Sequence, residues 1–206
     1  MIELGPLLVK GGWCQILAVQ DQPDLCAKVL IPKRRFQGER PDPNQIVSAK
    51  YGIADFLEYE WANYQKIMAA CPEDLQGHFV PMHGLQATSD GRKALVMDLV
   101  RDDLGQIAPS LVTNTRPLDP AFWANLERLR HEVFLARAID HFGIVRRNVL
   151  VKAPDYPVLI DFQTGRERFR GQFWLRYPFF VRAKLNRYFR KLYTEMGRTH
   201  NVHNSI

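Results

Sequence analysis

The chain reads His141-Phe142-Gly143-Ile144-Val145-Arg146-Arg147-Asn148-Val149-Leu150-Val151 and, after six intervening residues, Val158-Leu159-Ile160-Asp161-Phe162. Asn148 opens the first apolar run of this pair and Asp161 closes the second, thirteen residues later. Between the runs, residues 153–157 (Ala-Pro-Asp-Tyr-Pro) are rich in turn formers. The pattern predicts a β-hairpin that brings the amide oxygen of Asn148 and the carboxylate of Asp161 to one place.

An amide and a carboxylate at one place suit Mg²⁺, which prefers oxygen ligands and often links a protein to nucleotide phosphates. We therefore expect Asn148 and Asp161 to be metal ligands and catalytic residues of phosphoryl transfer, with Mg²⁺ and ATP as cofactors. The alternative for Asp161 is an ordinary strand-end aspartate that caps a turn.

The usual general base is missing from the same stretch. In the pattern H-R-D-x-x-x-x-N, an aspartate five residues before the asparagine accepts the proton of the substrate hydroxyl. Here that position is Gly143, although His141 occupies the histidine position. Asp140 is the remaining catalytic candidate and could substitute only if the loop bends differently. Positioning and electrostatics supply most of the rate enhancement, so the loss of the base need not abolish activity. The loss does point to slow, atypical or absent catalysis.

Composition limits the class of protein. The 206 residues suffice for one well-packed domain or two small lobes, and 46% are hydrophobic. Three cysteines without CxxC spacing argue against a disulfide framework and a zinc site and favour a reducing cytoplasm. We expect no signal peptide and no transmembrane helix, because no apolar run approaches about eighteen residues.

Periodicity predicts a strand-rich half followed by a mostly helical half. A stripe at spacings of three and four predicts a helix ending at Pro72, with Ile53, Leu57, Trp61, Tyr64 and Met68 on its apolar side. Residues 21–24 and 89–91 are expected turns, and residues 32–43 an exposed loop. Short apolar runs predict strands at residues 7–9, 16–19, 26–31, 84–88 and 94–97.

Two further helices are expected in the second half. Asp119-Pro120 is a typical N-cap followed by proline at the first helical position. The apolar side of the helix that begins there should carry Phe122, Leu126, Leu129, Val133 and Ala136. The last helix should run over residues 178–196. This order predicts an α+β protein: a single domain, 1–206, with a reduced protein-kinase-like fold. It comprises a small β-rich N-lobe (1–100), a short helical C-lobe (101–198) and a flexible tail (199–206).

Two charged residues lie where apolar residues are expected. Lys28 falls inside an apolar strand, and Glu60 falls within the apolar arc of the first helix. Each would be costly to bury alone, so we predict that they form an ion pair, with Lys28 facing the phosphates of a nucleotide. The alternatives are a strand with one polar face and a glutamate that reaches the edge of the stripe.

Other residues complete the predicted nucleotide site. Gly11 and Gly12 lie between the first two strands, where free backbone N–H groups could approach an anion. GxGxxG is absent, so a plain hairpin turn is the alternative. Met97 and Leu99, at the end of the strand-rich half, are the other expected cofactor contacts.

The basic charge is concentrated near the C-terminus. Ten Lys or Arg and two Glu lie within residues 166–198, a local charge of +8 against +6 for the whole chain. The ordinary interpretation is a packed last helix with solvated charges. Basic and aromatic residues together also suit an anionic membrane or lipopolysaccharide surface. Nucleic acid is a less favoured partner, because no recognisable nucleic-acid module accompanies the charges.

The ordered series Gly11-Gly12, Lys28, Glu60, Gly143…Asn148 and Asp161, followed by a C-terminal segment that is rich in Trp, Arg and Phe and includes the final helix, resembles the YrbL family. These are small bacterial kinase-like proteins of the PhoP regulatory network. Members commonly keep a Lys-Pro-x-Asn ending, whereas this chain has Val145-Arg146-Arg147-Asn148. The resemblance implies a kinase-like fold and a link to envelope or Mg²⁺-stress signalling, and it names no substrate.

Two functions remain open, with a third outside the kinase class. The first is an atypical kinase that transfers phosphate from Mg·ATP to a hydroxyl on a sugar, a lipid-linked molecule or a protein. It would act in the cytoplasm or at the inner face of the membrane. The second is a pseudokinase that uses the fold for binding or regulation without chemistry. The third is a basic adaptor for a membrane surface or nucleic acid.

Overall fold

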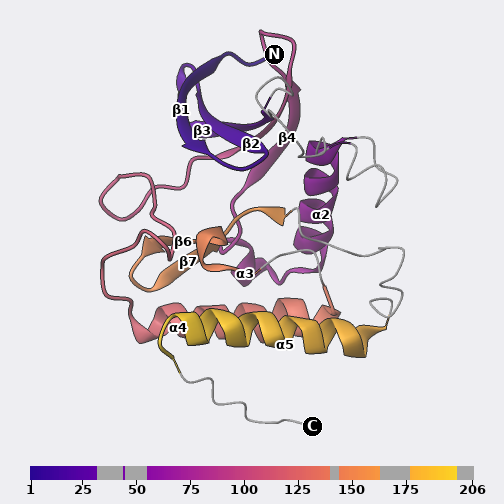
Figure 1. Ribbon diagram of the computed structural model, residues 1–206, viewed down its shortest axis with the longest axis vertical. Coiled ribbons are helices and arrows are strands. Elements are labelled where there is room, and N and C mark those ends of the chain that lie inside the picture. Colours follow the sequence, from indigo (N-terminus) through magenta and orange to yellow (C-terminus); the bar gives the residue numbers. More distant parts are fainter. Residues whose placement is uncertain (32–43, 45–54, 140–143, 163–176, 199–206) are drawn as a thin grey trace.

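The computed structural model describes residues 1–31, 44, 55–139, 144–162 and 177–198 (Figure 1). Within these residues the protein is of mixed α+β class, with an antiparallel N-terminal sheet followed by a two-stranded hairpin and several helices. The expected loop 32–43, the stripe residue Ile53, the loop residues Asp140, His141 and Gly143, the basic segment 166–176 and the tail 199–206 lie outside the described residues.

The five strands expected in the first half are confirmed, and they form one sheet in the order β1-β2-β3-β5-β4. The turn expected at residues 21–24 is shorter than predicted, because β3 already begins at Gln22. Asp21 makes the turn with a φ of 59°. Pro23 is tolerated in β3 because the β2–β3 register shifts there, so its missing N–H falls in an irregular stretch. The strands are β1 (Leu4–Lys10), β2 (Cys14–Val19), β3 (Gln22–Leu30), β4 (Met82–Ala87) and β5 (Lys93–Asp98).

The two faces of the sheet differ in what they pack against. Directly paired residues share a face, so Lys28 shares one with Ile16 and Leu95, its partners on the neighbouring strands. That face belongs to the main hydrophobic core, which continues into the helices and the hairpin. The opposite face carries Ala27 and Val29, which belong to a second, smaller cluster. Lys28 therefore points towards the centre of the molecule.

Helix α2 (Phe56–Ala70) begins at Asp55, whose carboxylate accepts hydrogen bonds from the backbone N–H groups of Leu57 and Glu58. As expected, the helix ends just before Pro72; a short helix α3 (Glu73–Gln76) then follows. The buried side is rotated from the predicted stripe. It is formed by Phe56, Leu57, Tyr59, Glu60, Asn63 and Ile67, whereas Trp61, Tyr64 and Met68 are only half-buried.

Hairpin β6 (Val149–Ala153) and β7 (Tyr156–Leu159) is the one predicted from the sequence, with a tighter turn at residues 154–155. Segments from both halves of the chain extend it. Val80 donates to the Leu159 carbonyl at 3.0 Å on one edge, and Leu111 donates to the Val149 carbonyl at 2.9 Å on the other. These backbone bonds fix the open end of the hairpin beneath the sheet (Figure 1).

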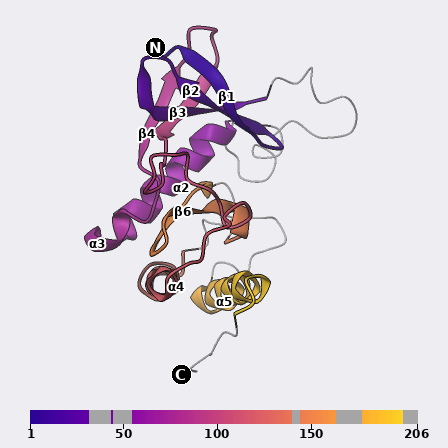
Figure 2. The ribbon, with the colours of Figure 1, turned by 90° about the vertical axis from the view of Figure 1, so that its left-hand side faces the viewer.

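The remaining helices lie side by side at the end of the molecule opposite the sheet (Figure 2). They are α4 (Pro120–Arg128), the π-helical turn η2 (Leu129–Leu135) that continues it, and α5 (Pro178–Glu195). Asp119 caps α4 as predicted. Ala136, expected on the buried side, is exposed, and Phe134 is buried instead. The wider π turn rotates the following residues around the helix.

Among the described residues, no helix combines the length and the apolar character needed to cross a membrane.

Candidate functional site

The predicted ion pair between the sheet and α2 is present. The ammonium of Lys28 on β3 lies 2.9 Å from Glu60 Oε1 and 2.8 Å from Oε2. Glu60 is fully buried, and the Lys28 side chain is 8% exposed. Because strand alternation turns Lys28 inward and helical spacing turns Glu60 towards it, the two charges compensate each other in the core.

Asp161, which follows β7, joins this pair. Its Oδ1 accepts a hydrogen bond from Lys28 Nζ at 3.0 Å, and its side chain is 28% exposed. Burial alone would lower the pKa of Lys28, but the carboxylates of Asp161 and Glu60 outweigh it and raise that pKa above its ordinary value. The site therefore holds a permanent cation between two carboxylates, one enclosed and one open to solvent.

The backbone at Asp161 adopts an unusual conformation. Its φ of 68° lies in the left-handed region, which residues other than glycine rarely occupy. The next residue is anchored on both sides: Phe162 N–H donates to Glu60 Oε1 at 3.3 Å, and its carbonyl accepts from Asn63 Nδ2 at 3.0 Å. The Phe162 ring is buried, with its centroid 5.4 Å from that of Tyr64. Helix α2 thus holds the turn that presents Asp161.

Asn148 lies beside this turn. It ends the short 3₁₀ helix Arg146–Asn148, and its carbonyl accepts from the N–H of Ile160 at 3.0 Å, one residue before Asp161. The hairpin register therefore brings Asn148 and Asp161 to the same end of β6 and β7, as predicted.

The oxygen ligands at this end of the hairpin are the Asp161 carboxylate and the Asn148 amide, and they fit a magnesium ion that also binds phosphates. Mg²⁺ is commonly held by one carboxylate and one amide, with phosphate oxygens and water as its other ligands. Within the described part of the chain, Asp161 Oδ2 makes no hydrogen bond, which leaves it available as a ligand. The described residues contain no group of three or more His, Cys, Asp or Glu that could hold a metal by themselves.

The glycine pair forms a tight turn between β1 and β2. Gly11 N–H donates to the Cys14 carbonyl at 2.8 Å, and Gly12 is exposed with open space where a Cβ would be. Trp13 packs edge-on against Phe56 at 5.4 Å, which ties the turn to the start of α2. Burial raises the pKa of Cys14 to about 12, although nearby Lys28 opposes this. The Cys14 thiol is therefore a packing group that lies near the charged trio of Lys28, Glu60 and Asp161.

Met97 lies on the Lys28 face of the sheet, where it pairs with Cys26, and it is buried. Leu99 follows β5, is half-buried against the main core, and donates its N–H to the Asp24 carbonyl at 2.8 Å. A separate depression of about 220 Å³ contains none of the predicted site residues. It is lined by Asp102, Asp103, Lys152, Ala153, Asp155 and Tyr156.

Sequence reasoning missed Asn63 and the backbone of Phe162. Asn63 lies three residues after Glu60 and therefore on the same side of α2. The spacing of the residues could have predicted the burial of Asn63. The buried side of α2 contains Phe56, Glu60, Asn63 and Ile67, which follow one another at spacings of three and four. The contact to Phe162 carries no local signal, because it joins residues 99 positions apart.

No family model matches this chain, and no curated protein is significantly similar to it.

Proposed function

We propose that the protein binds Mg·ATP between the N-terminal sheet and the β6–β7 hairpin, and that it is a reduced, kinase-like phosphotransferase. The observation that carries this proposal is the bonding of Lys28 to both Glu60 and Asp161. In such a site Lys28 contacts the α and β phosphates, Glu60 orients Lys28, and Asp161 with Asn148 holds the metal.

The geometry supports a specific exchange on binding. Lys28 shares its protons between two carboxylates, and the exposed one is also the metal ligand. A nucleotide phosphate would take over the contact that Lys28 makes with Asp161, and Mg²⁺ would compensate the freed carboxylate. The turn at Gly11 and Gly12 would cover the phosphates, and Met97 and Leu99 would contact the nucleotide.

The acceptor would be a hydroxyl on a sugar, a lipid-linked molecule or a protein. Asp140 is the proposed base, because Gly143 has no side chain. The resemblance of the residue series to the YrbL family supports a role in envelope or Mg²⁺-stress signalling. The three cysteines are free and buried, which suits a cytoplasmic protein.

The nucleotide site is tested by thermal unfolding with and without Mg²⁺ and ATP. A ligand at a hundred times its Kd stabilises the folded state by about 2.7 kcal/mol. At this chain length each kcal/mol raises Tm by about 2–4 °C. Asp161→Asn should abolish the shift, and the matched control Asp155→Asn, at the other end of the hairpin, should retain it. No shift at millimolar ATP would refute the nucleotide site.

A pseudokinase is the second candidate, favoured by the glycine at position 143. Release of ADP by the purified protein separates the two functions. A kinase should release ADP above the Asp161→Asn background, and Asp140→Asn should lower that rate. Nucleotide binding without ADP release, in the presence of sugar and protein acceptors, would favour the pseudokinase.

A further inference from the structure

The outward face of α5 carries an unusual combination of side chains. The helix lies at the end of the molecule farthest from the sheet (Figure 1, Figure 2). Its inner side is buried through Val181, Leu185, Phe189 and Leu192. The outer side is exposed along a helix of roughly 27 Å, from 1.5 Å per residue.

Positive charge on this face is largely uncompensated. Arg187, Arg190 and Lys191 are exposed, and the one acidic residue in α5 is Glu195. Lys191 lies 3.7 Å from Glu195, a loose and exposed pair. Among the described residues, Arg187 and Arg190 have no acidic partner.

Basic side chains on the neighbouring helices behave differently. Arg128 of α4 lies 2.7 Å from Asp74 and 2.9 Å from Glu132. Arg130 lies 2.7 Å from Glu127 and also donates to Asn186 on α5. The outer face of α5 is therefore a place where the fold leaves cations facing solvent.

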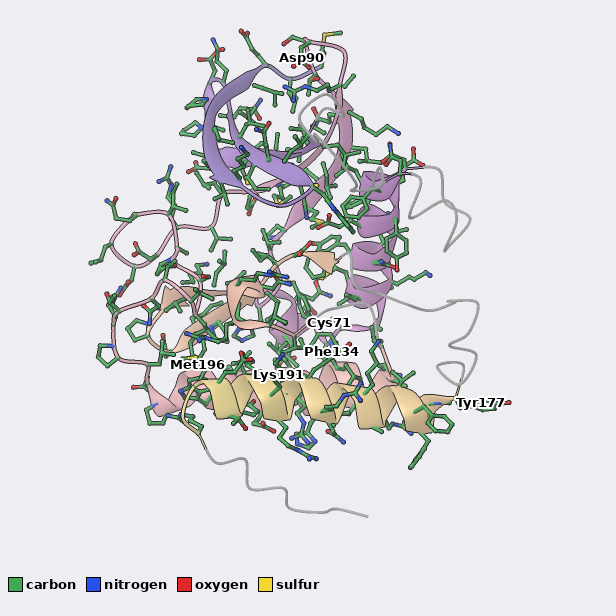
Figure 3. All side chains as sticks on the ribbon, viewed as in Figure 1. Cys71, Asp90, Phe134, Tyr177, Lys191 and Met196 are labelled. Atoms are coloured by element: carbon green, nitrogen blue, oxygen red, sulfur yellow. The ribbon has the colours of Figure 1, made fainter. Side chains whose placement is uncertain are left out.

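Aromatic side chains project from the start of the same helix. Tyr177, Phe179 and Phe180 are 59%, 73% and 45% exposed, and their rings contact one another edge-on. Figure 3 shows Tyr177 extending away from the body of the molecule. Phe180 precedes Arg187 and Lys191 by seven and eleven residues, so helical periodicity puts all three on one side.

We propose that this face docks on the anionic phospholipid surface of a bilayer. The docking face consists of the aromatic end (Tyr177, Phe179 and Phe180) and the basic stripe (Arg187, Arg190 and Lys191). The basic stripe would contact lipid phosphates, and the aromatic rings would enter the boundary between headgroups and acyl chains. A nucleic-acid duplex would engage the charges but would leave the neighbouring rings in water, which is why the bilayer is favoured.

Docking through α5 leaves β3, the strand that carries Lys28, on the opposite side of the β6–β7 hairpin (Figure 1). The membrane proposal does not depend on nucleotide binding, and its test contains no nucleotide. Failure of one proposal is therefore distinguishable from failure of the other.

The test is co-sedimentation of the full chain with vesicles of phosphatidylcholine, with or without phosphatidylglycerol. We expect the protein to pellet with the anionic vesicles and to be released by salt. Each basic side chain near an anionic surface contributes roughly fivefold to partitioning. R187Q/R190Q/K191Q should therefore weaken binding on the order of a hundredfold. F179A/F180A should weaken it by about tenfold or more, in a manner that salt affects little.

The matched control is K10Q/K66Q/K152Q, which removes the same charge from exposed lysines on β1, α2 and β6. It should keep most of the vesicle binding, and unchanged Tm values should show that all three variants are folded. Equal loss in the control and the α5 variant would overturn the proposal, as would no pelleting with anionic vesicles. Binding of duplex DNA without vesicle binding, lost in R187Q/R190Q/K191Q, would assign the face to nucleic acid and would also overturn it.

Discussion

Replacing Lys28 and Glu60, singly and together, tests how strongly this buried ion pair stabilises the folded protein. The proposed variants are Lys28→Met, Glu60→Gln and their combination. Methionine keeps most of the length and apolar surface of the lysine stem without its charge. Glutamine keeps an oxygen that can accept from the N–H of Phe162, the 3.3 Å contact made by Glu60.

The burial of each partner sets the expected magnitudes. Lys28→Met leaves Glu60 fully buried without its cation, and the loss of one partner from a buried pair destabilises by about 3–5 kcal/mol. Glu60→Gln is milder, at about 1–3 kcal/mol, because Lys28 keeps Asp161 at 3.0 Å. In the double variant no buried charge remains uncompensated within the pair. Its stability should therefore lie within about 2 kcal/mol of the unmodified protein.

Urea unfolding followed by circular dichroism measures these differences, provided that the m-values agree. We expect the double variant to lose at least about 2 kcal/mol less than the sum of the two single losses. Additivity to within about 0.5 kcal/mol would mean that Lys28 and Glu60 do not interact, and it would refute the site geometry. The single variants serve as each other's controls, because they remove opposite charges from one contact.

Three further changes probe the surroundings of the site. Asn63→Leu removes the donor to the Phe162 carbonyl and should lower the free energy of unfolding, measured in urea, by about 1–3 kcal/mol. A loss below about 0.5 kcal/mol would argue against that hydrogen bond. Asp161→Ala should be less stable than Asp161→Asn by about 1 kcal/mol, because asparagine tolerates the left-handed conformation at φ 68° better; equal stabilities would contradict this. His78 is buried, which lowers its pKa below the ordinary value of 6.5, while its Nδ1–H donates to the Pro157 carbonyl at 2.8 Å. Folding favours the neutral form of His78. The contribution of His78 to the free energy of unfolding is therefore fully present above pH 6.5, the unfolded-state pKa, and is lost as the pH falls towards the lower folded-state pKa. His78→Asn keeps a similar donor without titrating, and unfolding measured at about pH 7 and about pH 5 should show a smaller acid loss than in the unmodified protein; an equal loss would exclude His78 as the cause.

Local sequence signals were sufficient for most of the fold. Strand and helix positions follow from apolar periodicity and from the Asp119 cap, which acts within a few residues. The errors arose where tertiary contacts decide. The α2 stripe is rotated because the helix packs against both the sheet and Phe162, and Ala136 is displaced by a π turn that periodicity cannot anticipate.

The site was predictable for a different reason. A lysine and a glutamate in apolar patterns each require a partner, and this requirement linked Lys28 to Glu60 across 32 residues. The hairpin pattern likewise linked Asn148 to Asp161. The contact between Lys28 and Asp161 has no such signal, because an aspartate at a strand end is equally suited to solvent. Asn63 escaped notice because its partner is a backbone carbonyl, which carries no residue-specific pattern.

The energetics of the trio favour a ligand-binding role over a structural one. Apolar residues of similar size often replace a buried ion pair without loss of stability, so folding alone does not require Lys28 and Glu60. The left-handed backbone at Asp161 adds a further cost, typically about 1–3 kcal/mol, and such strain tends to accumulate at functional sites. If the trio serves a nucleotide, the Lys28→Met/Glu60→Gln variant should stay folded and lose its thermal response to Mg·ATP. A variant that folds and keeps that response would show that the buried charges do not bind the nucleotide.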